Sequence, residues 1–419
     1  MSLAGEGPTP VAPERVAEWI ERFAAISEPD SGPGVTRLAH TALERRAHEV
    51  FTDFMADLGL TVWTDAAGNT IAEKPGTEET AAVGTGSHLD SVPSAGRFDG
   101  IAGVVAAMLL AERVVTDGVG HRRPLRFVAF AGEEGARFGR ACIGSRIVAG
   151  LTTTADLHQL QDAKGVGLAE AMAGVGLDPD AVADARWSPR EWAGFVELHI
   201  EQGSVLADAG AAVGVVDVIS GSTRLELTVD GVAAHSGGMP MHLRRDALTA
   251  AAEVVLELEA LAGTADDGRR ITVGRLEALP GSITTIPGRC VLTVDIRDID
   301  LGRQRATAED VLERAATIAE RRGVTLTSCH LAEASPEELT PSVRRTLIDV
   351  AREVGTEPLV LPSGASHDTQ MIKQVCPVGM LFVPSRAGGV SHSPHEDTDF
   401  GDLARGADLL GAALLRLAR

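Results

Sequence analysis

Histidine and carboxylate side chains, which are good ligands for divalent metal ions, lie close together between residues 88 and 100. An apolar segment with the composition of a strand, residues 81–86, leads to His88 and Asp90. Because side chains alternate along an extended chain, we expect these two residues on one face. A loop then carries Asp99 to an apolar helix predicted from residue 101. The pattern favours a zinc or manganese site, although a structural histidine would explain this segment if it stood alone.

Similar side chains end or follow the other apolar strands of the predicted sheet. The candidate ligands are His88 after residues 81–86, Glu133 and Glu134 after 125–131, His199 at the end of 195–200, and His392 after 378–383. Ligands of parallel sheets bind at the carboxyl ends of the strands, so one shared site explains these residues better than separate structural roles. Three histidines and two acids exceed one four-coordinate ion and suit two ions that share a carboxylate. The remaining glutamate of the adjacent pair is then available as a general base.

The elements that position these residues predict an α/β fold. From residue 81 onward, apolar strands alternate with helices, which are predicted at 101–116 and 141–148. This alternation indicates a mixed, mostly parallel sheet with helices on both faces. Two amphipathic helices and a hairpin precede it. His40 and His48 are predicted on a solvent-facing side of the second helix, because charged residues surround them.

A second pattern begins near residue 221 and predicts an inserted domain. Its elements are strand 224–229, helix 245–261, strands 271–276 and 290–295, helix 308–322 and strand 324–330. The order β-α-β-β-α-β is that of a ferredoxin-like α+β domain. We therefore expect a catalytic metal-binding domain formed by residues 1–220 and 333–419, with residues 221–332 inserted. The length of 419 residues suits two domains.

Charge and composition limit the partners. The formal net charge of −21 argues against nucleic acid, because phosphate binding needs a basic surface. It also repels anions at long range, so a carboxylate substrate has to be recognised by arginines within a pocket. The longest apolar run, residues 101–111, is too short to cross a membrane, and the first residues lack the pattern of a signal peptide. Four cysteines without paired spacing predict reduced, buried thiols. We therefore expect a cytoplasmic protein that binds neither nucleic acid nor a membrane.

Several longer motifs carry a specific resemblance. They are Gly86-Ser87-His88-Leu89-Asp90, Gly96-Arg97-Phe98-Asp99-Gly100, Glu133-Glu134-Gly135-Ala136-Arg137-Phe138, Glu197 to Gly203, Ala234-His235-Ser236-Gly237, Ile286-Pro287-Gly288, Asp295-Ile296-Arg297-Asp298, Ser363 to Asp368 and Ser391-His392. With these motifs in this order, the chain resembles the metal-dependent amidase branch of the aminoacylase and carboxypeptidase G superfamily. Within that branch it is similar to the N-carbamoyl-L-amino-acid hydrolases, allantoate amidohydrolases and bacterial-type β-ureidopropionases.

The resemblance implies a role for each matching residue. One ion would be held by His88, Asp99 and His199, and the other by Asp99, Glu134 and His392. Zn²⁺ is the favoured metal, with Mn²⁺, Co²⁺ or Ni²⁺ as alternatives. The other implied roles are the general base for Glu133, orientation of His88 for Asp90, oxyanion stabilisation for His235, a carboxylate clamp for Arg297, and substrate contacts for Gln202, Thr284 and His367. The inserted domain would act as a lid and join two subunits into a homodimer.

Several positions depart from the resemblance, and two of them bear most directly on the site. Gly132 replaces an acid that usually precedes the glutamate pair, and Thr284 stands where an asparagine usually binds substrate. A hydroxyl reaches less far than an amide, so the substrate can differ. The implied function is hydrolysis of a carbamoyl C–N bond in a small carboxylate substrate, above all an N-carbamoyl-L-amino acid. The alternatives are an allantoate amidohydrolase, an aminoacylase or dipeptidase, and an inactive metal-stabilised binding protein.

Overall fold

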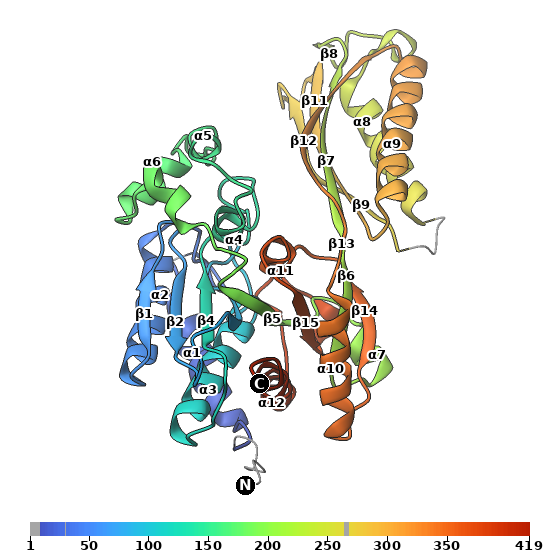
Figure 1. Cartoon of the computed structure of the whole chain (residues 1–419). Coiled ribbons are helices and arrows are strands. Elements are labelled where there is room, and N and C mark those ends of the chain that lie inside the picture. The colour runs from blue at the N-terminus through green and yellow to red at the C-terminus, as the bar shows by residue number, and fades with distance from the viewer. Residues whose placement is uncertain (1–8, 30, 264–267) are drawn as a thin grey trace. The chain divides into compact units, whose positions relative to one another are not determined.

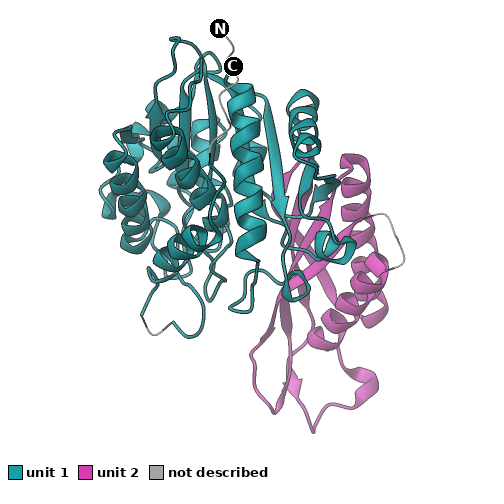
Figure 2. Ribbon diagram, turned by 90° about the horizontal axis from the view of Figure 1, so that it is seen from below, with its two compact units in different colours: residues 1–217, 339–419 teal, residues 218–338 magenta. Residues whose placement is uncertain are grey.

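A computed structural model describes residues 9–29, 31–263 and 268–419. The chain divides into two compact units (Figure 2). Unit 1 comprises residues 1–217 and 339–419, and unit 2 comprises residues 218–338. The range predicted for the insertion, 221–332, falls inside unit 2. Among the described residues, no helix combines the length and the apolar character needed to cross a bilayer.

The sheet of unit 1 has parallel strands at its centre. In order across the sheet the strands are β1 (Thr61–Thr64), β2 (Thr70–Lys74), β4 (Leu125–Phe130), β3 (Ala82–His88), β5 (Trp192–Ile200), β15 (Val378–Val383), β6 (Gly214–Ile219) and β13 (Glu337–Glu338), and β14 (Leu359–Ser363) also pairs with β6. Strands β4, β3, β5 and β15 run parallel, whereas β2 and β6 pair antiparallel to them (Figure 1). The predicted mixed α/β sheet is confirmed.

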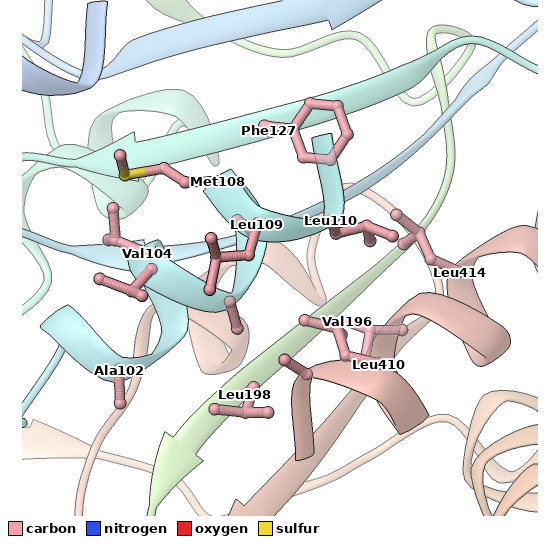
Figure 3. Close-up of a cluster of buried hydrophobic side chains, with 14 of the residues drawn as sticks. Ala102, Val104, Met108, Leu109, Leu110, Phe127, Val196, Leu198, Leu410 and Leu414 are labelled. Carbon is pink, nitrogen blue, oxygen red and sulfur yellow. The ribbon is translucent and has the colours of Figure 1, made fainter. Parts of the chain in front are cut away.

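Helices cover both faces of these central strands. The α-helices of unit 1 are α1 (Pro13–Ala24), α2 (Ala42–Asp57), α3 (Ile101–Thr116), α4 (Ile143–Val148), α5 (Thr154–Leu157), α6 (Leu168–Gly174), α7 (Val205–Ala209), α10 (Pro341–Glu353), α11 (Asp368–Ile372) and α12 (Phe400–Leu417), and two 3-10 helices lie at Pro179–Ala185 and Ala387–Gly389. Alternation along β5 separates the two faces. Val196 and Leu198 join the core formed with α3 and α12 (Figure 3), whereas Glu197 and His199 contact residues at α11 on the opposite face.

Helix α3 is the central element of this core. It is apolar along most of its length and is buried on nearly every side, as its composition predicts. Gly103 allows the close approach to β5, because a Cβ atom there would lie 2.3 Å from the Leu198 carbonyl oxygen. Since the buried side chains of α3 and β5 interlock, truncating Leu110 to alanine would cost roughly 2–5 kcal/mol. This packing fixes the strand ends that carry the candidate ligands.

Three details differ from the sequence-based expectations. His40 precedes α2 and is 2% exposed, and His48 is fully buried with Nδ1 2.9 Å from Thr70 Oγ1. The prediction of solvent-facing histidines is therefore wrong, because this side of α2 packs on the sheet. Cys329 is exposed rather than buried, since it lies on an edge strand. Helix α12 has no counterpart among the predicted elements, although Asp399 caps its first turn.

Unit 2 is a four-stranded antiparallel sheet with two helices. Across the sheet the strands are β12 (Thr325–Ala334), β7 (Gly221–Asp230), β11 (Arg289–Asp298) and β9 (Arg270–Leu279), and the helices are α8 (Ala247–Gly263) and α9 (Leu301–Arg322). Their order along the chain is β7-α8-β9-β11-α9-β12. Alternate residues of β7 and β11 pack against both helices. A separate ribbon pairs β8 (Ala234–His235) with β10 (Thr285–Ile286).

Candidate metal centre and active site

The candidate site forms around Asp99, which lies between β3 and α3. Asp99 Oδ1 lies 3.6 Å from His88 Nε2 and 3.2 Å from His199 Nε2. Asp99 Oδ2 lies 3.4 Å from His392 Nε2, which in turn lies 3.1 Å from Glu134 Oε2. The two oxygens of one carboxylate thus face two separate groups of donors. These groups have the composition expected from the sequence resemblance.

The strand ends explain why these residues meet. His88 is the last residue of β3, and His199 is the penultimate residue of the neighbouring parallel strand β5. Glu134 follows β4, and His392 follows β15. A glycine is required at position 100, next to Asp99. Its φ is +68°, and a Cβ atom there would lie 2.4 Å from the His88 ring. The structure therefore brings together all five predicted ligands at one edge of the sheet.

Hydrogen bonds orient the two buried imidazoles. His88 Nδ1 lies 3.2 Å from the Asp90 carbonyl oxygen, and His199 Nδ1 lies 2.9 Å from the Ile200 carbonyl oxygen. Each Nδ1 must carry a proton to donate these bonds, so in the neutral form of each ring Nε2 keeps its lone pair and faces Asp99. This is the tautomer that a metal-binding histidine requires.

Asp90 also fixes the turn that carries the glutamate pair. Its Oδ1 accepts a hydrogen bond from the Glu133 N–H at 2.8 Å, and its Oδ2 accepts one from the Glu134 N–H at 3.1 Å. Asp90 Oδ1 also lies 3.4 Å from His88 Nδ1. One carboxylate thus aligns a predicted ligand and the predicted general base. Glu133 Oε2 lies 3.9 Å from His88 Nε2, at the edge of the donor cluster.

Burial and charge strongly perturb these groups. Burial, with the nearby charge of Asp368 as a second cause, raises the pKa of Glu133 well above its usual range. Although burial opposes protonation of His88, its bonds to Asp90 and Asp99 raise its pKa well above the usual value. Hydrogen bonds to Asp99 and Glu134 raise the pKa of His392 to about 11. The cluster therefore attracts positive charge.

The donor set fits divalent cations. Histidine nitrogens and carboxylate oxygens converge within each of the two groups, and buried carboxylates are costly unless positive charge compensates them. Glu134 Oε1 is buried and has no hydrogen-bond partner among the described residues, so it is available as a second ligand atom. These observations match the metal dependence that the residue types predict.

Two predicted substrate contacts lie against the ligands. Gln202 Nε2 donates to Asp99 Oδ2 at 2.6 Å, and Gln202 Oε1 is buried with no partner among the described residues. His367 is 2% exposed, lies edge-on to the His199 ring at 4.6 Å, and has Nε2 2.8 Å from Ser363 Oγ. Both residues therefore belong to the same cluster as the candidate ligands.

Two supporting residues, Glu396 and Glu44, have no assigned role in the sequence-based prediction. Glu396 accepts hydrogen bonds from the N–H groups of Phe98 and Asp99 and from the Ser391 hydroxyl, and burial raises its pKa to about 7. Glu396 lies four residues after His392, so its nearness along the chain is the signal that could have found it. Glu44 comes from the distant helix α2, and no sequence signal links it to the site.

Glu44 explains the glycine at position 132. Its two oxygens accept hydrogen bonds from the N–H groups of His40 and Gly132, at 2.6 and 2.8 Å. Gly132 has a φ of +66°, and a Cβ atom there would lie 3.3 Å from both Ala39 Cβ and His40 Nε2. A side chain at position 132 would therefore be strained, and an acid from α2 binds this turn instead.

The predicted residues of unit 2 lie in more exposed surroundings. His235 is exposed, and its Nδ1 accepts a hydrogen bond from the Gly237 N–H at 3.1 Å. The exposed Thr284 lies next to it, because its carbonyl accepts from the Ser236 N–H at 2.9 Å. Arg297 is half-buried on β11, where its Nε donates to Asp295 Oδ2 at 2.9 Å.

Comparison with known proteins identifies the class that this fold and site define. The model of the family described as Peptidase family M20/M25/M40 matches residues 84–416. The chain belongs to this family, as the sequence resemblance predicts.

Individual relatives show which members of this family the chain is similar to. Over 412 residues the chain is 41% identical to an N-carbamoyl-L-amino acid amidohydrolase of Geobacillus stearothermophilus, covering 97% of this chain and 98% of the relative. An allantoate amidohydrolase of Escherichia coli is 32% identical, and the match covers 97% of each chain. Among solved structures, an amidase of the hydantoinase/carbamoylase family from Burkholderia vietnamiensis aligns with a TM-score of 0.89 at 31% identity, covering 98% of both chains.

Proposed function

We propose that the protein is an amidohydrolase that cleaves the carbamoyl C–N bond of an N-carbamoyl-L-amino acid, releasing the amino acid, ammonia and CO₂. The observation that carries this proposal is the arrangement of His88, His199 and His392 around Asp99, with Glu133 beside His88. Similarity to the amidohydrolases of that name supports the choice of bond and substrate. We also propose that the enzyme acts in the cytoplasm.

The site would hold two divalent cations, with Zn²⁺ favoured over Mn²⁺, Co²⁺ and Ni²⁺. His88, His199 and Asp99 Oδ1 would hold one, and His392, Glu134 and Asp99 Oδ2 the other. When bound, such ions polarise the substrate carbonyl and make water a stronger acid.

Glu133 would move the proton in this reaction. It would take a proton from the attacking water and return it to the leaving nitrogen. The carboxyl group that has taken the proton is then the acid that can donate it to the leaving nitrogen. Asp90 holds the Glu133 backbone in place for this transfer.

Unit 2 would complete the substrate site. Its element order supports a ferredoxin-like domain, which we propose as the lid and as the contact of a homodimer. His235 accepts a bond at Nδ1, so in its neutral form Nε2 carries the proton and can donate to the oxyanion. Arg297 would bind the substrate carboxylate. Gln202, Thr284 and His367 would contact the rest of the substrate.

One other substrate is favoured by specific observations. The similarity to an allantoate amidohydrolase supports allantoate, and Thr284 in place of an amide would change the contacts made with any substrate. The aminoacylase and dipeptidase alternative is weaker, because several similar relatives are named N-carbamoyl-L-amino acid amidohydrolases. An inactive binding protein is disfavoured, since the ligand residues and Glu133 are all assembled.

A substrate panel tests the proposal. Protein reconstituted with Zn²⁺, Mn²⁺ or Co²⁺ would be assayed with N-carbamoyl-L-amino acids, their D-enantiomers, allantoate and N-acetyl-L-amino acids. We expect metal-dependent ammonia release from the N-carbamoyl-L-amino acids. Amine release from the acetyl compounds alone would establish an aminoacylase instead. Absence of turnover on the whole panel, with two metals bound, would indicate a binding protein.

A further inference from the structure

A buried thiol lies against the proposed general base. Cys142 Sγ lies 3.0 Å from Glu133 Oε1, and Cys142 is 1% exposed. The backbone N–H of Cys142 also donates to the Glu133 carbonyl oxygen at 2.6 Å. Cys142 therefore holds both the main chain and the side chain of Glu133.

The start of helix α4 keeps the thiol in this place. Cys142 caps the helix with a left-handed φ of +59°, a conformation that is unfavourable for a residue other than glycine. The N–H groups of Cys142, Ile143 and Gly144 donate to the carbonyls of the three residues that follow β4, at 2.6–2.9 Å. These three bonds satisfy the first N–H groups of the helix and lock Cys142 beside Glu133.

The thiol is suited to donate rather than to attack. Burial, followed by the nearby charges of Glu133 and Asp368, raises the pKa of Cys142 well above its usual value. The group therefore keeps its proton, and a protonated, buried thiol is a poor nucleophile. Its acceptor is Glu133 Oε1, whereas Glu133 Oε2 faces His88 at the donor cluster.

We propose that Cys142 is a positioning residue for the general base. Its thiol anchors Glu133 Oε1, so that Oε2 is the oxygen that takes the proton from water and returns it to the leaving nitrogen. A carboxylate without this anchor rotates broadly about its terminal torsion and spends less time in the productive orientation. This inference rests on the proposed function of Glu133 as the base.

Two substitutions at position 142 test the anchor kinetically. Cys142→Ala removes the donor, and we expect kcat to fall about 3- to 10-fold, the effect of losing one hydrogen bond, with KM and metal content unchanged. Cys142→Ser keeps a donor and should recover most of the lost rate. Cys290→Ala, which truncates a buried thiol in the core of unit 2, is the matched control and should keep the wild-type kcat.

An infrared measurement tests the same contact without turnover. The difference spectrum between wild type and Cys142→Ala isolates the S–H stretching band of Cys142. A thiol that donates to a carboxylate absorbs at lower wavenumber, so this band should move to higher wavenumber in a Glu133→Ala background.

The outcomes separate the two proposals. If Glu133→Gln turns over at the wild-type rate, the base assignment fails, whatever the Cys142 variants do. If Glu133→Gln is inactive but Cys142→Ala keeps full kcat, or the S–H band stays in place without Glu133, the anchor alone is overturned.

Discussion

The buried ligand residues of unit 1 and the ribbon residues of unit 2 are held in opposite ways, whereas His392 of unit 1 is exposed. In unit 1, His88, Asp99 and His199 are at most 6% exposed, and each contacts another charged or polar side chain of the site. In unit 2, His235 and Thr284 are exposed and are placed mainly by backbone hydrogen bonds of a short ribbon. Buried charge must be compensated, so unit 1 requires a network, whereas an exposed imidazole is already solvated.

Because of this difference, we expect substitutions in the two units to affect stability and activity differently. A substitution in the network of unit 1 removes a partner from another buried group and should affect both metal binding and folding. A substitution in the ribbon of unit 2 leaves no buried group unpaired, so it should change turnover alone. The following substitutions test that distinction.

The largest loss of activity is expected for Glu133→Gln. The amide cannot take a proton from water, and general acid–base catalysis contributes on the order of 10²–10⁴ in rate. We expect kcat to fall by about that factor, with two metal ions per chain retained because Glu133 is not a proposed ligand. Turnover and metal content measured on the same sample check this. A wild-type rate would exclude Glu133 as the base.

The second largest effect is expected for His235→Ala in unit 2. Loss of one donor to an oxyanion lowers kcat by roughly 10²–10³. The melting temperature should stay at the wild-type value, because His235 is exposed. His330→Ala, which truncates another exposed histidine of unit 2, is the control and should change neither quantity. A large drop in melting temperature for His235→Ala would contradict the contrast between the units.

Asp90→Asn should give an intermediate effect on both properties. An asparagine keeps one acceptor oxygen, so one of the N–H groups of Glu133 and Glu134 loses its partner. Residues that orient metal ligands typically change affinity or activity by about 10–100-fold. We expect weaker metal binding in a chelator competition and a lower melting temperature. Asp53→Asn on the exposed side of α2 is the control. Unchanged metal affinity would remove Asp90 from the supporting network.

The sequence allowed the clustering of the candidate ligands to be predicted, because each lies at the end of an apolar strand or in the loop that follows it. Parallel strand ends share an edge, and the types of His88, Asp99 and His392 limit the chemistry there. The central helix could be predicted at its observed bounds, Ile101–Thr116, because it is apolar along most of its length. In both cases the signal is local in the chain.

The supporting residues could not be predicted because their partners are distant in sequence. Glu44 and Gly132 are 88 positions apart, and only the packing of α2 brings them together. The burial of His48 has the same cause, since the charged residues beside it point to other sides of the helix. Gly132 departs from the motif that the sequence resembles, but its partner Glu44 is identified only by the structure.

The smallest effect, mainly on stability, is expected for Glu44→Gln, which is farther from the candidate ligands than Asp90 is. Burial, with the charge of Asp90 as a second cause, raises the pKa of Glu44 from 4.5 to about 8. A carboxyl whose pKa is higher in the folded state stabilises the fold below pH 4.5, and this contribution is lost as the pH rises through about 8. Glutamine cannot titrate and leaves one buried N–H poorly paired, at a cost of about 1–3 kcal/mol.

Wild type should therefore melt above Glu44→Gln at pH 6, and the difference should shrink by pH 9. Other titrating groups are common to both proteins and cancel in this difference. Glu49→Gln, on the exposed side of the same helix, should show no such trend. A melting difference that stays constant from pH 6 to 9 would mean that Glu44 is already ionised in the fold. In that case the turn that bears Glu133 would be held by a buried charge rather than by a neutral acid.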